Sequence, residues 1–235
     1  MKKISVIIPV LNDLEALNEL MHHLRKSRDR NYFEVIIVDG GSKQTPDITE
    51  CTRTRLIRST KPGRAIQMNL GARNSKYDIF YFVHADTLPS PTFVSDINSA
   101  IERQYEVGGF RLKFNSKDHL LYINSFVTRF NTPFSGGGDQ SLFITRNRFL
   151  TENGFNEKYT IMEDFEFVNR LRPKTGYHII PKYIEASSRK YENNDYFQVN
   201  VANLKAFWLF KIGVDPDIIR NKYHNWLKNI NRVNE

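Results

Sequence analysis

Carboxylate side chains follow several apolar segments of this sequence, at positions where a β-strand would end. Asp13 and Asp86 each stand three residues after such a segment, and Asp39 closes another. In an open parallel sheet these strand ends meet at one edge, and ligands bind outside that edge. Carboxylates repel one another unless a cation or the hydrogen-bond donors of a ligand hold them. The spacing therefore predicts a polar or cation-dependent site, although Asp13 and Asp39 could instead cap a helix or a turn.

A second acidic pair, Glu163 and Asp164, opens a segment with helical spacing that runs to Arg172. A positioned carboxylate can take the proton of a hydroxyl group that attacks a substrate. Two acids at the start of a helix also interact favourably with the helix dipole. The pair by itself therefore fits a catalytic role and a structural one.

The elements that must position these acids alternate between strand-like and helix-like segments in the first half of the chain. We expect strands over 5–10, 33–41, 55–59 and 79–83, and helices over 14–24, 63–74 and 91–104. Asn12 with Glu15 resembles a capping box, and Pro91 suits a first helical turn. Uninterrupted apolar strands that alternate with helices indicate a parallel sheet covered on both faces.

The second half is less regular, and it holds a glycine-rich loop at 135–140. We expect strands over 108–114, 140–145 and 177–184, helices over 117–130 and 163–172, and two C-terminal helices broken at Gly213 and Pro216. Without a repeat or an evident linker, residues 1–235 are expected to form one domain.

Composition and charge narrow the class of protein. The 235 residues are 40% hydrophobic, which is typical of a globular chain. The single cysteine, Cys51, cannot form an intrachain disulfide, which favours a reducing cytoplasm. No segment approaches the roughly 20 apolar residues that a membrane span needs.

The net charge of +8 is concentrated towards the C-terminus. Residues 170–235 hold 12 Lys and Arg against 6 Asp and Glu, and the apolar segment 206–210 lies between Lys205 and Lys211. Such a segment could face phosphates, nucleic acid or an anionic membrane, or could simply be a solvated surface.

Five segments resemble the family 2 glycosyltransferases in order and approximate spacing: VIIPVLND, VDGGS, GRAIQMNLGA, FVHADT and MEDFEFVNRLR. The likeness is strongest to a bacterial subgroup with HADT in place of the usual Asp-x-Asp motif, which also has a GDQ loop and a serine–arginine–aromatic stretch. The resemblance implies an α/β GT-A fold, with a mostly parallel twisted sheet, helices on both faces, a smaller acceptor-side half and C-terminal helices. Residues 1–105 would bind a nucleotide-sugar and residues 106–235 an acceptor. The implied reaction is sugar transfer with inversion, and without a Q-x-x-R-W sequence we expect a non-processive enzyme.

The resemblance also implies a nucleoside pocket lined by Pro9, Leu11, Asp13 and Asp39. Asp39 would accept a hydrogen bond from N3–H of uracil, so we expect a UDP-sugar in preference to a GDP-sugar. Arg64 would reach the base or the pyrophosphate, or would be a solvated arginine at the start of a helix.

Asp86 matches the last acid of the Asp-x-Asp motif, which implies that it binds Mn²⁺ or Mg²⁺. A divalent cation can stabilise a diphosphate leaving group as a Lewis acid, and both ions prefer oxygen ligands. His84 replaces the first acid of the motif. We therefore expect Asp86 to be the protein ligand and His84 to bond the ribose or a phosphate rather than the metal.

The remaining implied roles belong to the second half. Asp164 matches the general base, and Glu163 would orient the acceptor. Asp139 and Gln140 would bond sugar hydroxyls or would only form a turn, and Arg189 would clamp the diphosphate.

Two other functions fit parts of the sequence. A sugar nucleotidyltransferase shares a sheet with metal-binding carboxylates, but its first strand usually leads into a glycine-rich basic loop rather than LNDLEAL. A basic module that binds nucleic acid or a membrane surface would explain the C-terminal charge. As partners we expect the donor, a glycan or lipid-linked acceptor and a peripheral contact with the inner membrane face, but no specific nucleic acid.

Overall fold

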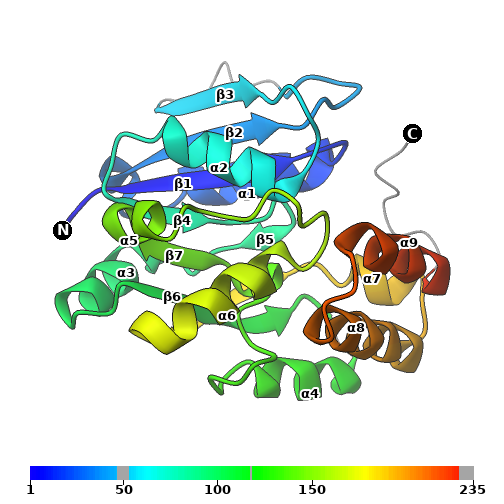
Figure 1. The fold of residues 1–235 in the computed structure, drawn as a ribbon. Helices are drawn as coiled ribbons and strands as arrows, with labels where there is room; N and C mark the ends of the chain where they lie inside the picture. The colour runs from blue at the N-terminus through cyan, green and yellow to red at the C-terminus, as the bar shows by residue number, and fades with distance from the viewer. Residues whose placement is uncertain (47–52, 117, 228–235) are drawn as a thin grey trace.

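The computed structural model describes residues 1–46, 53–116 and 118–227, so Cys51 lies outside the described residues. One sheet runs through it in the strand order β3-β2-β1-β4-β7-β6-β8-β5 (Figure 1). The strands are β1 (Ile4–Val10), β2 (Phe33–Asp39), β3 (Thr54–Arg58), β4 (Ile79–Phe82), β5 (Thr87–Leu88), β6 (Val107–Phe114), β7 (Leu142–Thr145) and β8 (His178–Ala186).

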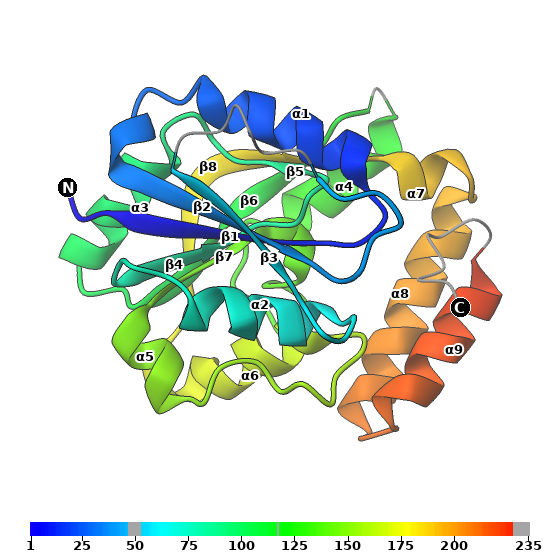
Figure 2. The same ribbon diagram turned by 90° about the horizontal axis from the view of Figure 1, so that it is seen from above.

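Helices cover both faces of this sheet, and two more lie beyond the carboxyl ends of its parallel strands (Figure 2). The helices are α1 (Leu14–Arg25), α2 (Arg64–Arg73), α3 (Phe93–Glu102), α4 (His119–Val127), α5 (Arg146–Thr151), α6 (Glu163–Thr175), α7 (Arg189–Glu192), α8 (Tyr196–Lys211) and α9 (Pro216–Trp226), with 3₁₀ turns η1 (Arg30–Tyr32) and η2 (Gly138–Gln140). In Figure 2, α1 lies on one side of the sheet, α2, α5 and α6 lie on the other, and α8 and α9 stand past the strand ends.

Alternating side chains of β1 build two separate cores. Ile4, Val6 and Ile8 pack with α1 and α3, whereas Ile7 packs with α2, α5 and α6. Successive residues of a strand point to opposite faces, so a strand buried on both sides must be apolar without interruption. This explains why the first-half strands read as continuous apolar runs.

Helix α2 lies close against β1 and β2 because it has a glycine at the contact. A Cβ atom on Gly71 would come within 2.4 Å of Ile7 Cγ2. The Gln67 amide of the same helix donates to the carbonyls of Val10 (2.9 Å) and Val38 (2.6 Å). The helix thereby holds the carboxyl ends of both strands in place.

Strand β7 reverses the direction of the sheet. The pairs β1–β2, β1–β4 and β2–β3 are parallel, but β7 is antiparallel to both β4 and β6. Leu142 at the start of β7 lies opposite Phe82 at the end of β4. The loop before β7 is therefore brought to the edge where the predicted acids stand.

The predicted elements are confirmed, with some local corrections. The direction of the second-half strands, which the sequence left open, is mixed, and short elements such as β5, α5 and α7 were not predicted. Asn12 caps no helix: its φ is 52° and its side chain accepts from the Lys43 amide. Pro91 precedes the N-cap residue Thr92 and so lies outside the first turn of α3. Within the described ranges, no helix has both the length and the apolar character that crossing a membrane requires.

Substituting Gly71 by Ala should destabilise the protein, although Ala favours a helix by about 1 kcal/mol. The added methyl would overlap the fully buried Ile7, and such overpacking costs about 1–3 kcal/mol. We expect a net loss in the free energy of unfolding, measured by urea denaturation. Arg73→Ala on the same helix, where the side chain is 59% exposed, should change it by less than about 0.5 kcal/mol. Equal stability of both variants would contradict the close packing of α2.

Candidate active site

Asp39 ends β2 and organises the loop that follows it. The side chain is 1% exposed. Its Oδ1 accepts from the Ser42 amide (2.9 Å), the Ser42 hydroxyl (2.6 Å) and the Gly41 amide (3.3 Å). The Ser42 hydroxyl oxygen in turn accepts from the Asn12 amide (2.9 Å). The loops after β1 and β2 are thus joined beside Pro9, which lies in β1 opposite Val38.

Asp13 and Arg189 form an ion pair between residues 176 positions apart. Arg189 Nη1 and Nη2 donate to the two carboxylate oxygens at 3.0 and 2.7 Å. The hydrogen bond to Asp13 is the largest cause that raises the pKa of Arg189. Leu11 is half-buried just before this pair. The structure therefore joins the end of β1 to the segment that follows β8.

Asp86 lies close to the same pair because β5 pairs with β8. The Ser187 amide donates to the Asp86 carbonyl at 3.1 Å. Burial, followed by repulsion from Asp139, raises the pKa of Asp86, while Arg64 and Arg189 act in the opposite direction. The carboxyl group of Asp86 thus lies where negative charge is only partly compensated.

His84, Glu163 and Asp164 form a buried cluster between the end of β4 and the start of α6. His84 Nε2 lies 3.7 Å from Asp164 Oδ2, and ligand atoms of all three residues lie within 4.8 Å of one another. Their exposed fractions are 8%, 2% and 7%. Such a group could hold a metal ion or the polar atoms of a substrate.

The start of α6 is fixed by contacts with α2. Met162, just before the helix, has a left-handed backbone with φ of 63°. The side-chain amide of Asn69, in α2, bonds the loop before α6. It donates to the Phe155 carbonyl (2.9 Å) and accepts from the Phe155 backbone N–H (3.0 Å). Gly154 has φ of 64°, and a Cβ there would come within 2.6 Å of Asn69 Oδ1. These contacts orient the helix so that its first two acids face His84.

Arg64, the first residue of α2, supplies positive charge to this group. Its Nη1 lies 3.7 Å from Glu163 Oε1, and its side chain is 63% exposed. Desolvation lowers the pKa of Arg64, but the carboxylates of Glu163, Asp86, Asp164 and Asp139 together raise it. Glu163 Oε1 is nevertheless buried without a hydrogen-bond partner among the described residues. The cluster therefore still offers an unused acceptor.

Burial shifts the proton affinities of the central pair in opposite directions. Burial, then the neighbouring Glu163, raises the pKa of Asp164 well above its usual value. Burial, then Arg64, lowers the pKa of His84 to about 4. At neutral pH the histidine is therefore uncharged, and the Asp164 carboxylate is more basic than an exposed one. Such shifts are common among groups that transfer protons.

The two residues of the GDQ loop have different environments. Gln140 is buried: its Oε1 accepts from the Gly136 amide (2.7 Å) and its Nε2 donates to the Phe110 carbonyl (3.1 Å). Asp139 is exposed and acts on the pKa of Asp86 and Asp164. The sequence left open whether these residues bind sugar hydroxyls or only form a turn. The bonds of Gln140 are those of a turn-forming residue, whereas Asp139 faces the acidic cluster.

The sequence analysis assigned no site role to Gln67, which bonds the ends of β1 and β2, or to Asn69, which bonds the loop before α6. A usable signal was present. Both are polar residues of an expected helix that also holds Ala65, Met68 and Ala72, and the structure buries all five. A buried amide on an otherwise apolar helix face must bond something, and here it bonds strand ends and a loop.

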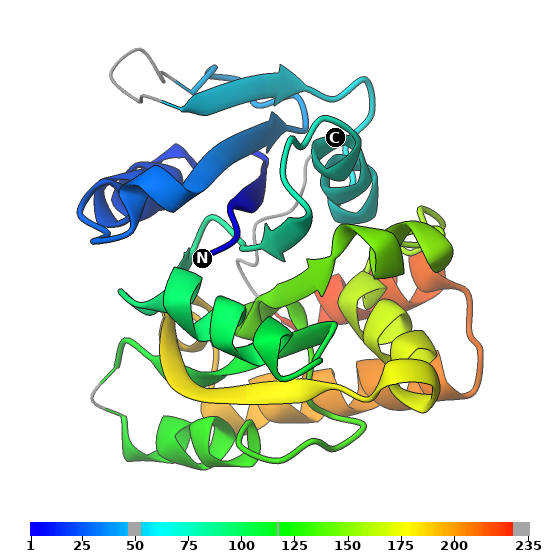
Figure 3. The same ribbon diagram turned by 90° about the vertical axis from the view of Figure 1, so that its left-hand side faces the viewer.

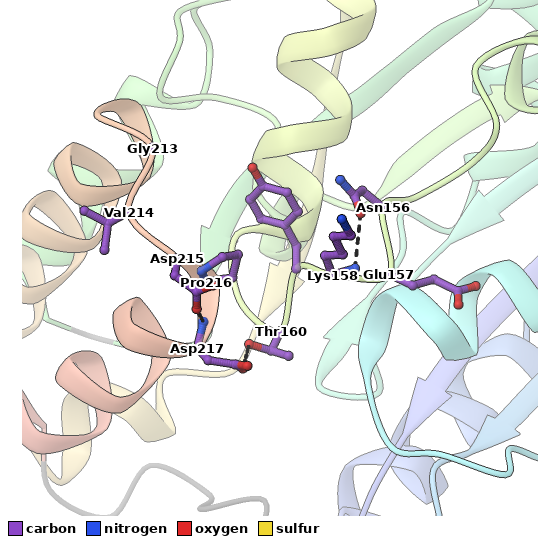
Figure 4. Close-up of a pocket in the computed structure, with 10 residues that line it drawn as sticks. Asn156, Glu157, Lys158, Thr160, Gly213, Val214, Asp215, Pro216 and Asp217 are labelled. Atoms are coloured by element: carbon purple, nitrogen blue, oxygen red, sulfur yellow. Dashed lines mark hydrogen bonds between the residues drawn. The ribbon is translucent and has the colours of Figure 1, made fainter.

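A separate cavity of about 660 Å³ opens between residues 156–160 and 213–217 (Figure 4). Across it, the Thr160 hydroxyl donates to Asp217 Oδ1 at 2.8 Å. No predicted site residue lines this cavity. It is therefore distinct from the acidic cluster, although the loop that forms one wall leads into α6.

The comparisons with known proteins agree with one another. The model of the family described as glycosyl transferase family 2 matches residues 5–177. An uncharacterised glycosyltransferase of Haemophilus influenzae is 25% identical over 185 residues, which are 72% of this chain and 61% of that protein, so the chain spans about three fifths of this relative. Among solved structures, the mannosyltransferase PcManGT of Pyrobaculum calidifontis, in complex with GDP-Man and Mn²⁺, superposes with a TM-score of 0.63 at 17% identity over 94% of this chain and 68% of that one. TarS 1-349 of S. aureus gives a TM-score of 0.63 at 16% identity over 95% and 70%.

Replacing Asp164 by Asn should stabilise the protein at neutral pH. Because the pKa of Asp164 is raised, the folded chain binds this proton more tightly than the unfolded chain. The resulting stabilisation is fully present below the unfolded pKa of about 3.9 and is lost as pH rises through the folded pKa. The Asn side chain of the variant has no proton to lose in this range, so the variant keeps this stability at neutral pH. We expect the variant's Tm to be higher by about 2–4 °C near neutral pH, the shift that about 1 kcal/mol gives in a chain of this size.

Thermal unfolding at a series of pH values checks this, and the two Tm values should converge towards the unfolded pKa. Asp78→Asn, at a position 87% exposed, is the matched control and should show no such gain. A wild-type Tm equal to or above that of Asp164→Asn at neutral pH would mean that the buried carboxylate is well compensated.

Proposed function

The chain belongs to glycosyl transferase family 2, and from this we propose that it transfers a sugar from a nucleotide-diphosphate sugar to an acceptor hydroxyl, with inversion and without processivity. It has the GT-A fold that the sequence predicted. The observation that carries the proposal is the buried contact between His84 and Asp164, which joins the end of β4 to the start of α6. A donor bound along the sheet edge and an acceptor bound beside α6 would meet there.

The nucleoside would lie at the ends of β1 and β2, against Pro9, Leu11 and Asp39. The bonds within the DGGS loop all use Asp39 Oδ1, and the other oxygen would accept from the base. N3–H of uracil is a suitable donor, so we propose a UDP-sugar in preference to a GDP-sugar. That PcManGT is in complex with GDP-Man supports a nucleotide-sugar donor in general.

A divalent cation, Mn²⁺ or Mg²⁺, fits the residues at the end of β4. Asp86 is a hard oxygen ligand whose pKa is raised by burial and by Asp139, so a nearby cation would relieve uncompensated charge. The Mn²⁺ in the PcManGT complex supports this. When bound, the ion would stabilise the negative charge of the leaving diphosphate as a Lewis acid. Asp86 would hold it, and neutral His84 would donate to the ribose or a phosphate.

Arg189 would contribute to diphosphate binding from the other side. Its guanidinium forms a bidentate pair with Asp13 and also acts on Asp86. Arginine matches phosphate oxygens with the same two-pronged geometry that it uses for a carboxylate. Donor binding would therefore replace the Asp13 carboxylate by phosphate oxygens as the partner of Arg189.

Asp164 would act as the general base. The acceptor oxygen forms a bond to the anomeric carbon and gives its proton to the Asp164 carboxylate, while the bond from that carbon to the diphosphate oxygen breaks. Burial makes this carboxylate more basic, and Glu163, tied to Arg64, would orient the acceptor. Asp139 would bond a sugar hydroxyl, and Gln140 would hold its loop.

The two halves would share this work. Residues 1–105 contribute the nucleotide side of the site, and residues 106–235 contribute Asp139, the acid pair of α6 and Arg189. We propose that all of them act as one glycosyltransferase domain with a glycan or lipid-linked acceptor. Family membership disfavours the nucleotidyltransferase alternative.

Asp86→Ala should remove the Mn²⁺-dependent part of nucleotide affinity. Titration calorimetry of UDP with and without Mn²⁺ should show a metal-dependent gain in the wild type, a smaller one in His84→Ala and none in Asp86→Ala. Asp78→Ala, at the opposite end of β4, is the control and should behave like the wild type. If Asp86→Ala keeps the full Mn²⁺ effect, Asp86 does not hold the metal.

Asp164→Asn should reduce turnover and leave donor binding intact. The amide has nearly the same size but cannot take the acceptor proton, so the transfer rate should fall by roughly 10²–10⁴, the usual contribution of a general base. Donor affinity should change by less than about threefold, since Asp164 contacts the acceptor side. Glu163→Gln should have a milder effect. Near-normal transfer by Asp164→Asn with a true acceptor would refute the assignment.

A further inference from the structure

Helix α8 is apolar on two opposite sides. Val199, Ala202 and Ala206 are buried in a core shared with α9. The opposite stripe consists of Phe197, Val201, Leu204 and Trp208, which are between 48% and 66% exposed. These four recur at intervals of four, three and four residues, which aligns them along one line of the helix. A helix that is apolar all round is normally covered on all sides.

Helix α4 has the same two-sided character. Leu121 and Ser125 are its buried residues, and its outer side is apolar rather than charged. The exposed apolar residues of α4 and the turn after it are Leu120, Tyr122, Ile123, Phe126, Val127 and Phe130, at 37% to 57% exposure. A solvated helix would carry charged groups at such positions.

The two stripes belong to one surface. Asn124 of α4 donates to Asn200 of α8 (3.0 Å) and accepts from Tyr196 (2.9 Å). Figures 1 and 3 both show α4 (green) and α8 (orange) along the lower side of the molecule. We call this surface the α4–α8 face. It consists of Leu120, Tyr122, Ile123, Phe126, Val127, Phe130, Phe197, Val201, Leu204 and Trp208. A surface this rich in exposed apolar side chains marks an interaction site.

The charged side chains along this face are mostly basic, although the N-cap residues of α4 and α8, Asp118 and Asp195, are acidic. Residues 119–134 and 196–214 contain no Asp or Glu, but they contain Arg129, Lys205 and Lys211. A symmetric contact between two copies would bring these cations together. An anionic bilayer would instead pair them with lipid phosphates.

The chemistry of the side chains agrees with a bilayer surface. Trp208 and Tyr122 are amphipathic aromatic residues, which are enriched at the level of the lipid headgroups. Helices that lie in this interface bury an apolar side and keep basic groups near the phosphates. We propose that the α4–α8 face seats the protein on an anionic membrane surface, with both helices parallel to the bilayer plane. Of the apolar segment noted in the sequence, Trp208 belongs to this face, whereas Phe207 is buried.

Vesicle flotation with the full chain tests this proposal independently of sugar transfer, since it needs neither donor nor acceptor. The protein should float with vesicles of phosphatidylcholine and phosphatidylglycerol, less with pure phosphatidylcholine, and less again as salt rises. Leu204→Glu and Trp208→Glu should each lower vesicle affinity by roughly tenfold or more. Leu150→Glu, on α5 at a position 60% exposed, should bind like the wild type. Circular dichroism confirms that each variant is folded.

The depth of Trp208 provides a second measurement. The chain has two tryptophans, so Trp226→Phe leaves Trp208 as the only tryptophan, whose fluorescence is excited selectively at long wavelength. Brominated lipids should quench its fluorescence when the mixed vesicles are added. Absence of quenching, or equal flotation of wild type and Trp208→Glu, would overturn the proposal. A lipid-free dimer that Trp208→Glu dissociates would overturn it as well, since the face would then join two copies of the chain.

Discussion

The burial of two adjacent carboxylates at the start of α6 is the constraint to which the surrounding structure responds. Glu163 and Asp164 are both less than a tenth exposed, and Glu163 Oε1 has no hydrogen-bond partner among the described residues. Buried negative charge is costly unless it is neutralised or paired. The compensation comes from Arg64 and from the positive end of the α6 dipole. It is incomplete, which is why the pKa of Asp164 is raised and why the group is suited to accept a proton.

Holding the acids in this position requires contacts that cross the molecule. Asn69 on α2 fixes the loop before α6, and Gln67 on the same helix fixes the ends of β1 and β2. Gln140 holds the loop that leads into β7. Three buried side-chain amides, which do not themselves react, thus set the distances between the charged groups of the site. Because amides are neutral and bond two or more partners each, they position charged groups without adding to the charge.

The sequence predicted the parts of this arrangement that depend on local patterns. The apolar runs of β1, β2 and β4 identified the strands, and the acids after them identified the edge where Asp39 and Asp86 stand. The pair of Asp13 with Arg189 could not be predicted, because it joins residues 176 positions apart. The two-residue strand β5 has no periodicity of its own and exists only because it pairs with β8. The mixed second half of the sheet escaped prediction for a related reason, since strand direction depends on the path of the connections and not on which residues are apolar.

The same reasoning connects the α4–α8 face to the donor side of the site. Asn124, which joins α4 to α8, also donates to the hydroxyl of Tyr191 in α7 (3.0 Å). Two residues before Tyr191, Arg189 pairs with Asp13 at the end of β1. Helix α7 therefore has the apolar face on one side and the acidic edge of the sheet on the other. The proposed bilayer surface is therefore linked through α7 to Arg189, the residue proposed to bind the diphosphate of the donor.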